Sequence, residues 1–138
     1  MADRLQLDII TPERGLLSEA VDAVTLPGPG GELGILPGHT PLISQLQTGV
    51  LSYTQGGATK RLLVSGGFVE VSDDRVAVLA ELAERPEEVD AARARTERDQ
   101  AEKLLGSTTG SEDDLARART QFERSVARLQ IAGDSSSN

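Results

Sequence analysis

The side-chain types that most often carry catalysis are nearly absent from this sequence. Its 138 residues include no cysteine and a single histidine, His39, which follows Pro37-Gly38. A thiol nucleophile, a cysteine zinc site and a multi-histidine metal site are therefore excluded. No carboxylate pair is marked by its spacing as an acid and a base, and His39 is better explained by a structural hydrogen bond or a partner contact. We therefore expect no catalytic residue and no metal ligand.

Glycine-rich segments raise the question of a phosphate-binding loop. None of them matches the spacing Gly-x-x-x-x-Gly-Lys-Ser/Thr. The segment Gly56–Lys60 lies between two strand-like runs rather than before a helix, so it is better explained as a hairpin turn. Spacing alone therefore indicates no nucleotide-binding loop.

Charge and composition exclude further classes of protein. The chain carries 14 basic and 22 acidic residues, a net charge of −8, whereas nucleic-acid binders present a basic patch. With no Trp, and Tyr53, Phe68 and Phe122 as its aromatic residues, a site for stacked bases or sugars would lack its usual side chains. No apolar run is long enough to cross a membrane, and no basic-then-apolar leader precedes Leu5. We expect a protein that is used where it is synthesised.

Residues 1–83 have the pattern of short strands separated by turns. Apolar and polar residues alternate in Leu5–Ile9 and again in Arg75–Leu79, as they do in half-buried strands. Turn signals between the strand-like runs include Gly56-Gly57, Gly66-Gly67 and Asp73-Asp74. Many short strands with frequent turns predict an antiparallel β-sandwich over residues 1–83.

Residues 84–138 predict an antiparallel hairpin of two helices. The segment from about Pro86 to Leu105 is rich in strong helix formers, and Pro suits a first helical turn. After a glycine-containing break, Ser111 is a good N-cap for a second helix that runs to about Ala132. From Gly133 onward we expect a frayed tail.

The predicted hairpin offers little apolar surface for packing. In the second helix one narrow stripe consists of Leu115, Ala118, Phe122, Val126 and Leu129. The first helix contributes mostly alanine, which buries less apolar area than leucine. Helices of this length depend on tertiary packing, so we expect the hairpin to dock weakly on the sandwich.

A long glycine- and proline-rich segment resembles a family signature. The segment Leu26–Leu42, with Gly-Glu-Leu-Gly-Ile-Leu-Pro-Gly-His at Gly31–His39, resembles that of the epsilon subunit of bacterial and chloroplast F-type ATP synthases. Leu46–Val50 and the Gly-Gly-Phe segment Val64–Val71 match in order, and a charged helical hairpin ends the chain. The resemblance therefore covers essentially the whole sequence.

This resemblance implies a non-catalytic subunit of the central stalk. In the family, the sandwich binds the foot of the gamma subunit and rests on the ring of membrane c subunits, coupling proton flow to ATP synthesis. Glu32 matches the position that faces the c-ring, and His39 either shapes the same loop or contacts a stalk neighbour. Association with the membrane is expected through the complex only, at the cytoplasmic face of a bacterial plasma membrane or at a thylakoid in a photosynthetic source.

The resemblance also implies an inhibitory role for the hairpin. In the family it lies folded against the sandwich or extends along gamma into the catalytic alpha/beta hexamer, where it blocks rotation in the direction of ATP hydrolysis. The cations that match the element meeting acidic loops of the beta subunits are Arg117, Arg119, Arg124 and Arg128. Arginine suits such contacts because it pairs with carboxylates through two parallel hydrogen bonds.

Some members bind regulatory ATP at the folded hairpin, although the family requires no cofactor. Val89–Ala94 is similar to their Ile/Leu-Asp-x-x-Arg-Ala motif, with Val at the first position, and Gln100 stands where an arginine is often found. The positions that match the ATP site are Glu84, Asp90, Arg93, Ala94, Arg124 and Arg128. The alternative is that these residues form ordinary salt bridges between helix side chains, worth a few tenths of a kcal/mol each.

Two other functions stay open at this point. The chain could be a free-standing β-sandwich interaction module whose helical hairpin recruits an unrelated partner. An enzyme is a more distant alternative, because no nucleophile, base and orienting group can be assembled from the sequence. Co-purification with gamma and the catalytic hexamer separates the stalk subunit from the free-standing module.

Overall fold

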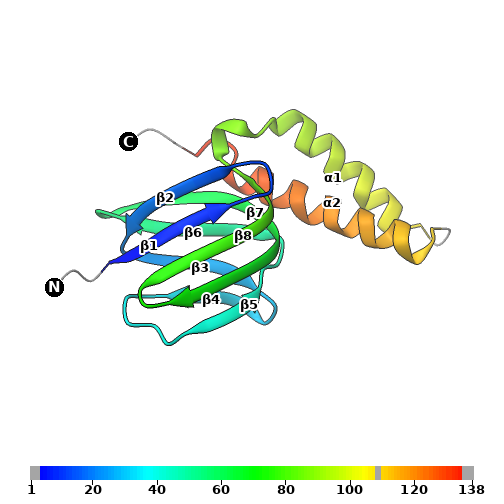
Figure 1. The fold of residues 1–138 in the computed structure, drawn as a ribbon. Helices are drawn as coiled ribbons and strands as arrows, with labels where there is room; N and C mark the ends of the chain where they lie inside the picture. Colours follow the sequence, from blue (N-terminus) through cyan, green and yellow to red (C-terminus); the bar gives the residue numbers. More distant parts are fainter. Residues whose placement is uncertain (1–3, 108–109, 135–138) are drawn as a thin grey trace.

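Alternating apolar and polar residues build the N-terminal part of the chain into strands (Figure 1). The structure is a computed structural model that describes residues 4–107 and 110–134. Within them the strands are β1 (Leu5–Ile10), β2 (Gly15–Val21), β3 (Ala23–Gly28), β4 (Gly31–Ile35), β5 (Leu42–Gln45), β6 (Gly49–Gln55), β7 (Ala58–Ser72) and β8 (Arg75–Glu84). A single 3-10 turn (Pro86–Glu88) and the helices α1 (Ala91–Leu105) and α2 (Glu112–Ile131) follow. A β-sandwich followed by a two-helix hairpin is thus confirmed.

The strands pair in the order β2-β1-β8-β7-β6-β3-β4, and β5 pairs with β7. The described pairings are antiparallel except the one between β1 and β8, which is parallel from Gln6 opposite Arg75 to Ile10 opposite Leu79. The sheet is therefore mixed, where the sequence predicted antiparallel strands throughout. These two strands come from distant parts of the chain, so no tight turn obliges them to run in opposite directions.

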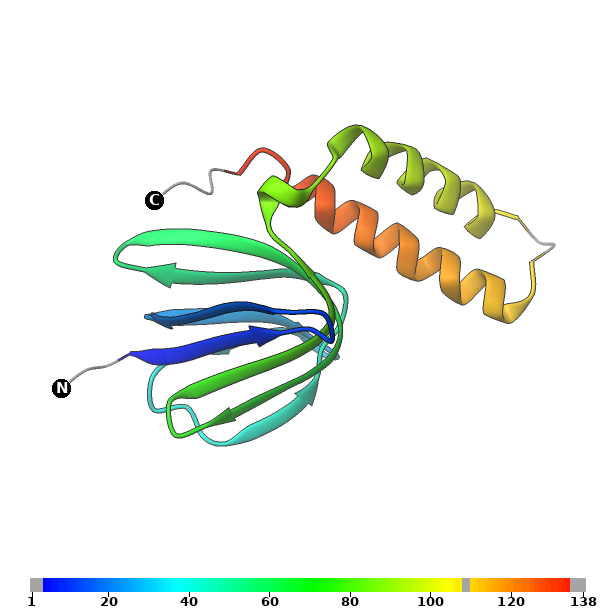
Figure 2. The ribbon, with the colours of Figure 1, turned by 45° about the horizontal axis from the view of Figure 1, so that its top comes forward.

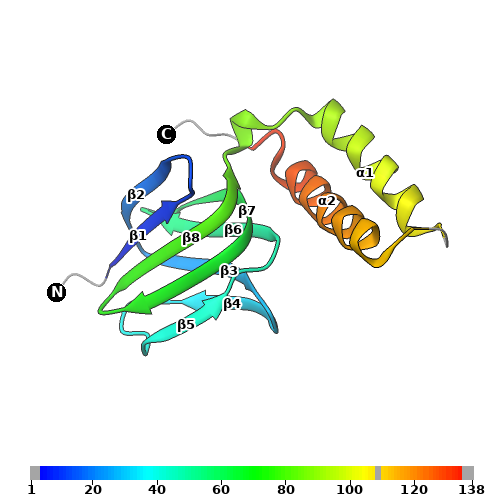
Figure 3. The same cartoon turned by 45° about the vertical axis from the view of Figure 1, so that its right-hand side comes forward.

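Strand β7 bends at Gly66 and Gly67, whose φ angles are +73° and +100° (Figure 3). Before the bend β7 pairs with β6, and after it with β5, while β8 follows β7 on both sides of the bend. A Cβ atom at residue 67 would collide with the carbonyl oxygen of Leu79. The sequence predicted a turn between strands at this glycine pair. The pair instead lies inside one long strand, because its left-handed backbone bends β7 without ending the pairing with β8.

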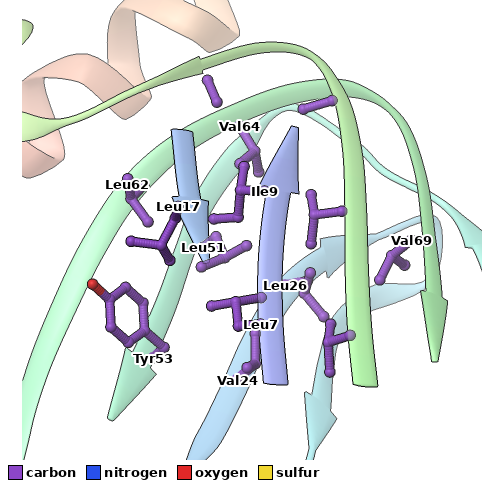
Figure 4. Packing of buried hydrophobic residues seen from close by; sticks show 14 of the residues in the cluster. Leu7, Ile9, Leu17, Val24, Leu26, Leu51, Tyr53, Leu62, Val64 and Val69 are labelled. Carbon is purple, nitrogen blue, oxygen red and sulfur yellow. The ribbon is translucent and has the colours of Figure 1, made fainter. Parts of the chain in front are cut away.

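Inward-facing residues of these strands form one apolar core (Figure 4). In β1, Leu5, Leu7 and Ile9 are buried while the residues between them are partly exposed, so the predicted alternation is confirmed. Val24 and Leu26 of β3 are buried on a single face in the same way. The core relies on branched aliphatic side chains, which pack well on a pleated surface.

The hairpin begins later than the sequence indicated. Residues Pro86–Glu88 form one 3-10 turn, Val89 and Asp90 are extended, and α1 starts at Ala91. Asp90 is its N-cap, because the side chain accepts a hydrogen bond from the backbone N–H of Arg93 at 3.1 Å. Ser111 caps α2 in the predicted manner, accepting from the N–H of Asp114 at 3.1 Å.

Helix α2 lies between α1 and the sandwich (Figure 2), and this position changes which of its residues are buried. Of the predicted stripe Leu115, Ala118, Phe122, Val126 and Leu129, the fully buried member is Ala118. The other buried residues of α2 are Ser125, Ala127 and Ile131. A helix with neighbours on two sides needs buried residues on two faces, whereas the predicted narrow stripe supplies only one.

We expect Gly67→Ala to destabilise the protein strongly. The substituted residue would adopt a left-handed φ and place a Cβ against a backbone oxygen that cannot move aside, which should cost about 2–4 kcal/mol. Gly34→Ala is the matched control, because Gly34 also lies within a strand but has open space around its Cα. Urea unfolding measures both, and a loss below about 0.5 kcal/mol for Gly67→Ala would contradict the role of the bend.

Candidate functional site

The joint between the hairpin and the sandwich is centred on a small apolar contact. Leu63 of β7 packs with Ala127 and Ile131 of α2, and all three are buried. The partly buried residues around them are Val50, Leu82 and Val89. Because this cluster is much smaller than the core of the sandwich, polar contacts must contribute to holding the hairpin in place.

An ion pair between Glu84 and Arg128 joins the end of β8 to α2. The Nε and Nη2 atoms of Arg128 donate to the two oxygens of Glu84 at 2.8 and 2.9 Å. Both side chains are 20% exposed. The hydrogen bonds to Glu84 raise the pKa of Arg128 above its ordinary value, while burial opposes that shift. The remaining nitrogen, Nη1, lies 3.7 Å from Glu97 of α1, which joins the first helix to the same cluster.

A second ion pair holds the end of α2. Arg61 of β7 donates from Nε and Nη2 to the two oxygens of Asp134, each at 2.8 Å. The same guanidinium donates to the backbone carbonyl of Gln130 at 2.7 Å. A cation at a helix C-terminus is favourable because it satisfies free carbonyls and complements the helix dipole. Asp134, which the sequence placed in a frayed tail, is thus held by Arg61, and residues 135–138 of that predicted tail lie outside the described part of the chain.

A third polar contact lies beyond the Glu84–Arg128 pair, on the side away from Arg61. Arg124 donates from Nε to the hydroxyl of Ser65 at 2.8 Å, and Ser65 also hydrogen-bonds to Thr48 at 2.7 Å. Ser65 is buried next to the bend in β7. A buried hydroxyl needs hydrogen-bond partners, and Arg124 supplies one while the hairpin is docked.

The linker between the two parts is fixed to the sandwich. Arg14, in the turn between β1 and β2, forms an ion pair with Glu88 at 2.7 Å. The Glu88 side chain also accepts from the backbone N–H of Arg85 at 2.8 Å, and Arg85 donates from its guanidinium to the carbonyl of Leu16. The linker up to Glu88 therefore belongs to the sandwich, and free rotation can begin only beyond it.

The structure brings four of the six predicted ATP-site residues to one cavity of about 240 Å³. Its lining residues are Glu84, Glu88, Val89, Asp90, Arg93, Glu97 and Arg128. Arg124 faces Ser65 outside this lining, and Ala94 is buried in α1. This volume is below the range of about 300–1,000 Å³ that is typical of pockets for organic ligands.

The charges around this cavity do not suit a triphosphate. Of the described residues that line it, four are carboxylates and two are guanidiniums. Arg128 is paired with Glu84, and Arg93 lies 3.3 Å from an oxygen of Glu97. Asp90 is engaged as the cap of α1. Because the cations are paired with carboxylates in this conformation, the residues do not fit the phosphates, and regulatory ATP stays a prediction.

The signature segment is stretched along strand β4, which separates its two candidate contact residues. Glu32 is exposed on β4 next to the turn that joins it to β3, opposite Pro27. His39 lies in the loop at the other end of β4, where Nδ1 is 2.6 Å from the carbonyl oxygen of Thr40. The loop is fixed by Asp74, which accepts from the N–H of Gly38 at 2.7 Å. Glu32 and His39 therefore cannot contact one small site together.

The remaining predicted partner residues lie on the outer part of α2. Arg117 is exposed and forms an ion pair with Asp114 at 2.8 Å within the same helix. Arg119 is exposed, and its side chain makes no hydrogen bond or ion pair with the described residues. The four predicted arginines thus divide into an exposed pair, Arg117 and Arg119, and a pair engaged with the sandwich, Arg124 and Arg128.

An exposed apolar row crosses the sandwich. Ile10 of β1 lies opposite Leu79 of β8, and Leu79 lies opposite Phe68 of β7. Ile43 of β5 shares this outer face, because it is two residues from the partner of Phe68. These side chains are 45–72% exposed. Contiguous exposed apolar side chains on a sheet mark an interaction surface.

Sequence reasoning missed four residues of the joint: Arg61 and Ser65 of the sandwich, and Glu97 and Asp134 of the hairpin part. The charge of Arg61 within a strand otherwise rich in apolar residues could have marked it as a contact residue. The sequence could not have identified Asp134 as its partner, because 73 residues separate the two.

Neither metal binding nor membrane insertion is indicated within residues 4–107 and 110–134. No group of three or more His, Cys, Asp or Glu side chains is arranged there to hold a metal ion. In the same part of the chain, no helix combines the length and the apolar character that a bilayer span requires.

Two family models match nearly the whole chain. The beta-sandwich domain of the ATP synthase delta/epsilon chain matches residues 4–86, and the long alpha-helix domain of the same chain matches residues 87–133. An ATP synthase epsilon chain from Nitratidesulfovibrio vulgaris is 46% identical over 134 residues, covering 97% of this chain and 99% of its own length. One from Desulforamulus reducens is 45% identical over 132 residues, covering 96% and 99%.

Solved structures share the fold. A chain in the Euglena gracilis mitochondrial ATP synthase structure of OSCP, F1 and c-ring aligns with a TM-score of 0.80 and 25% identity, covering 94% of this chain and 81% of that one. A chain in the central stalk and c-ring of the Tetrahymena thermophila enzyme aligns with a TM-score of 0.63 at 16% identity, covering 91% and 94%. The latter shows a shared fold alone.

The pH dependence of hairpin docking follows from Asp134. Its hydrogen bonds from Arg61 hold the pKa of the carboxyl below its ordinary value, and burial opposes them. A carboxyl with a lowered native pKa stabilises the docked state above its unfolded pKa and loses that contribution as the pH falls through the native pKa. Arg61 and Asp134 line one cavity, and the other charged residues that line it are Glu19, Lys60, Arg85 and Glu87. We therefore expect docking to weaken on acidification below about pH 4, with no such loss above it.

An NMR titration of the Asp134 carboxyl checks this expectation. In Arg61→Gln its pKa should rise toward the ordinary aspartate value. Lys60→Gln removes the same charge from the neighbouring position and should leave the titration of Asp134 nearly unchanged. An ordinary pKa for Asp134 in the unmodified chain contradicts the assignment.

Proposed function

The chain belongs to the delta/epsilon family of ATP synthase subunits, non-catalytic components of the central stalk of the F-type enzyme, and on that premise we propose distinct roles for its two parts. The sandwich docks on the gamma subunit and the c-ring, and the hairpin restrains ATP hydrolysis. The observation that carries the proposal is the division of the molecule into a rigid sandwich with an exposed apolar row and a hairpin held by few contacts.

The apolar row is the surface we assign to the gamma subunit. Ile10, Ile43, Phe68 and Leu79 lie on neighbouring strands and are large apolar side chains that the sandwich itself does not cover. A stalk subunit that must turn with gamma needs a stable contact, and burying such side chains supplies it. His39 lies in the loop that precedes β5, close to the Ile43 end of the row.

Glu32 is the residue we assign to the c-ring. It is exposed on β4, which is the edge strand of the described sheet order. An exposed carboxylate on an edge suits polar loops or cations of a partner better than an apolar surface. The separation of Glu32 from His39 is consistent with two different partners for the two ends of the signature segment.

The hairpin is the part we assign to inhibition. In the docked state Arg124 and Arg128 are engaged with the sandwich, while Arg117 and Arg119 face solvent. We infer that all four meet acidic loops of the catalytic beta subunits once the hairpin extends into the alpha/beta hexamer. Planar guanidiniums suit these contacts, because each can pair with a carboxylate through two parallel bonds.

The site of action we propose is the cytoplasmic face of a bacterial plasma membrane, reached through the complex. The relatives from Nitratidesulfovibrio vulgaris and Desulforamulus reducens, both bacteria, support that assignment. Proton translocation and ATP synthesis are then properties of the assembled complex, to which this subunit contributes coupling and no chemistry.

Removing the hairpin should accelerate ATP hydrolysis by the assembled complex. We expect a chain truncated before Glu87 to support hydrolysis at about five times the rate of the full chain, or more, because typical coupling energies between sites have that size. The comparison uses the complex reconstituted with each chain, and co-sedimentation verifies that both assemble. Equal rates would remove the inhibitory role and leave the place in the stalk intact.

Polar substitution in the apolar row should weaken assembly with gamma. Phe68→Ser removes a large apolar side chain that is 54% exposed, so we expect little change in stability and roughly tenfold weaker binding to the gamma subunit. Leu104→Ser is the matched control, because Leu104 is also 54% exposed but lies on α1. Surface-immobilised gamma measures both affinities. Similar affinities for the two variants would reject this surface as the docking site.

A further inference from the structure

We propose that Glu84 is an internal competitor for Arg128. Its carboxylate occupies the donors that a phosphate ligand would need, so the hairpin docks through the chain's own ion pairs and without a nucleotide. This inference concerns the docked hairpin in the structure and does not depend on an inhibitory role. It also reverses the role that the family resemblance implied for Glu84, from a residue that binds the ligand to one that excludes it.

In the ion pair between Glu84 and Arg128, the carboxylate already occupies the position that a phosphate would take. A phosphate is best bound by two parallel N–H donors of one guanidinium. In Arg128 these donors, Nε and Nη2, are taken by the two oxygens of Glu84 at 2.8 and 2.9 Å. The third nitrogen faces Glu97 at 3.7 Å, so a phosphate approaching Arg128 meets carboxylates on two sides.

The balance of charge in the cavity also disfavours a phosphate ligand. Among the described residues that line the cavity, Glu84, Glu88, Asp90 and Glu97 outnumber the two arginines. A polyphosphate would therefore enter a site of negative balance and would have to displace a partly buried carboxylate from Arg128. Replacing Glu84 by glutamine removes one negative charge and frees part of the guanidinium, so it should favour the phosphate.

The position of Glu84 explains why the same pair controls docking. It is the last residue of β8 and therefore belongs to the sandwich, whereas Arg128 belongs to α2. The apolar cluster of Leu63, Ala127 and Ile131 is small, and Arg61 holds the far end of the helix. Among the described contacts, two ion pairs join α2 and its end to the sandwich, so loss of either leaves one.

The first experiment measures docking. The sequence has no cysteine, so cysteines introduced at exposed Ala58 and Lys103 of the full chain carry spin labels at defined positions. Pulsed electron resonance between the labels gives the docked and undocked fractions. In Glu84→Gln we expect the docked-to-undocked ratio to fall about tenfold. Glu81→Gln, with the same charge change on an exposed residue of the same strand, should leave the ratio unchanged.

The same labels test the nucleotide. In the chain with Glu84 intact, raising the salt concentration to about 0.5 M should reduce the docked fraction, because ion pairs are screened. Adding 1 mM ATP, roughly a physiological level, should leave the docked fraction unchanged. An increase of the docked fraction with ATP, or equal ratios for Glu84→Gln and Glu81→Gln, overturns the proposal.

The second experiment measures phosphate binding by calorimetry with sodium tripolyphosphate and with ATP. We expect Glu84→Gln to bind tripolyphosphate at least tenfold more tightly than the unmodified chain, since it exposes Arg128. ATP binding that is present in the unmodified chain and lost in Glu84→Gln would assign Glu84 to the ligand and overturn the proposal. Equal results for the two proteins, bound or unbound, overturn it as well.

Discussion

The bend in β7 is the constraint on which the rest of the structure depends. One continuous strand pairs with β6 before Gly66 and with β5 after Gly67, and β8 follows it along its other edge. The same strand presents Leu63 and Ser65 to the hairpin just before the bend and Phe68 to solvent just after it. The backbone conformation of Gly66 and Gly67 therefore determines how the surface that receives α2 is oriented relative to the exposed apolar row.

The joint shows how a hairpin with little apolar surface can still take up a defined position. Apolar burial at Ile131 is non-directional and would allow α2 to slide or rotate. The ion pairs of Arg61 and Arg128 are directional, because each guanidinium meets both oxygens of one carboxylate. Each adds a modest amount to the free energy of docking at these partly exposed sites, and both also determine the orientation of the helix. A helix held in this way is well ordered and readily released.

The sequence predicted those features that depend on local pattern. Alternation in β1 and the cap at Ser111 are confirmed, since each is decided by residues a few positions apart. The bend at Gly66 was mistaken for a turn, because a left-handed glycine pair suits both and only the pairing with β8 distinguishes them. The resemblance to the family is likewise confirmed, since a contiguous signature can be read without any knowledge of contacts.

The candidate site was predicted less well because its residues are chosen by long-range geometry. The sequence predicted a helix from about Pro86, which would include Asp90, whereas Asp90 lies before α1 as its cap. Which carboxylate pairs with Arg128 depends on where β8 ends, and the partner of Arg61 depends on how far α2 extends. A run of nine signature residues looked like one loop, yet β4 stretches it at about 3.3 Å per residue and separates Glu32 from His39.

The attachment of the linker to Arg14 has a mechanical consequence. Since residues up to Glu88 are tied to the turn between β1 and β2, the hairpin and the sandwich share one short pivot at Val89 and Asp90. The cap of α1 is the second residue of that pivot, and its hydrogen bond to Arg93 lies entirely on the helix side. Any movement of the hairpin away from the sandwich therefore rotates an intact α1 about the two residues that precede it. The distance that the far end of the hairpin travels is then set by the length of the helix, because no long flexible linker is present between Glu88 and Ala91.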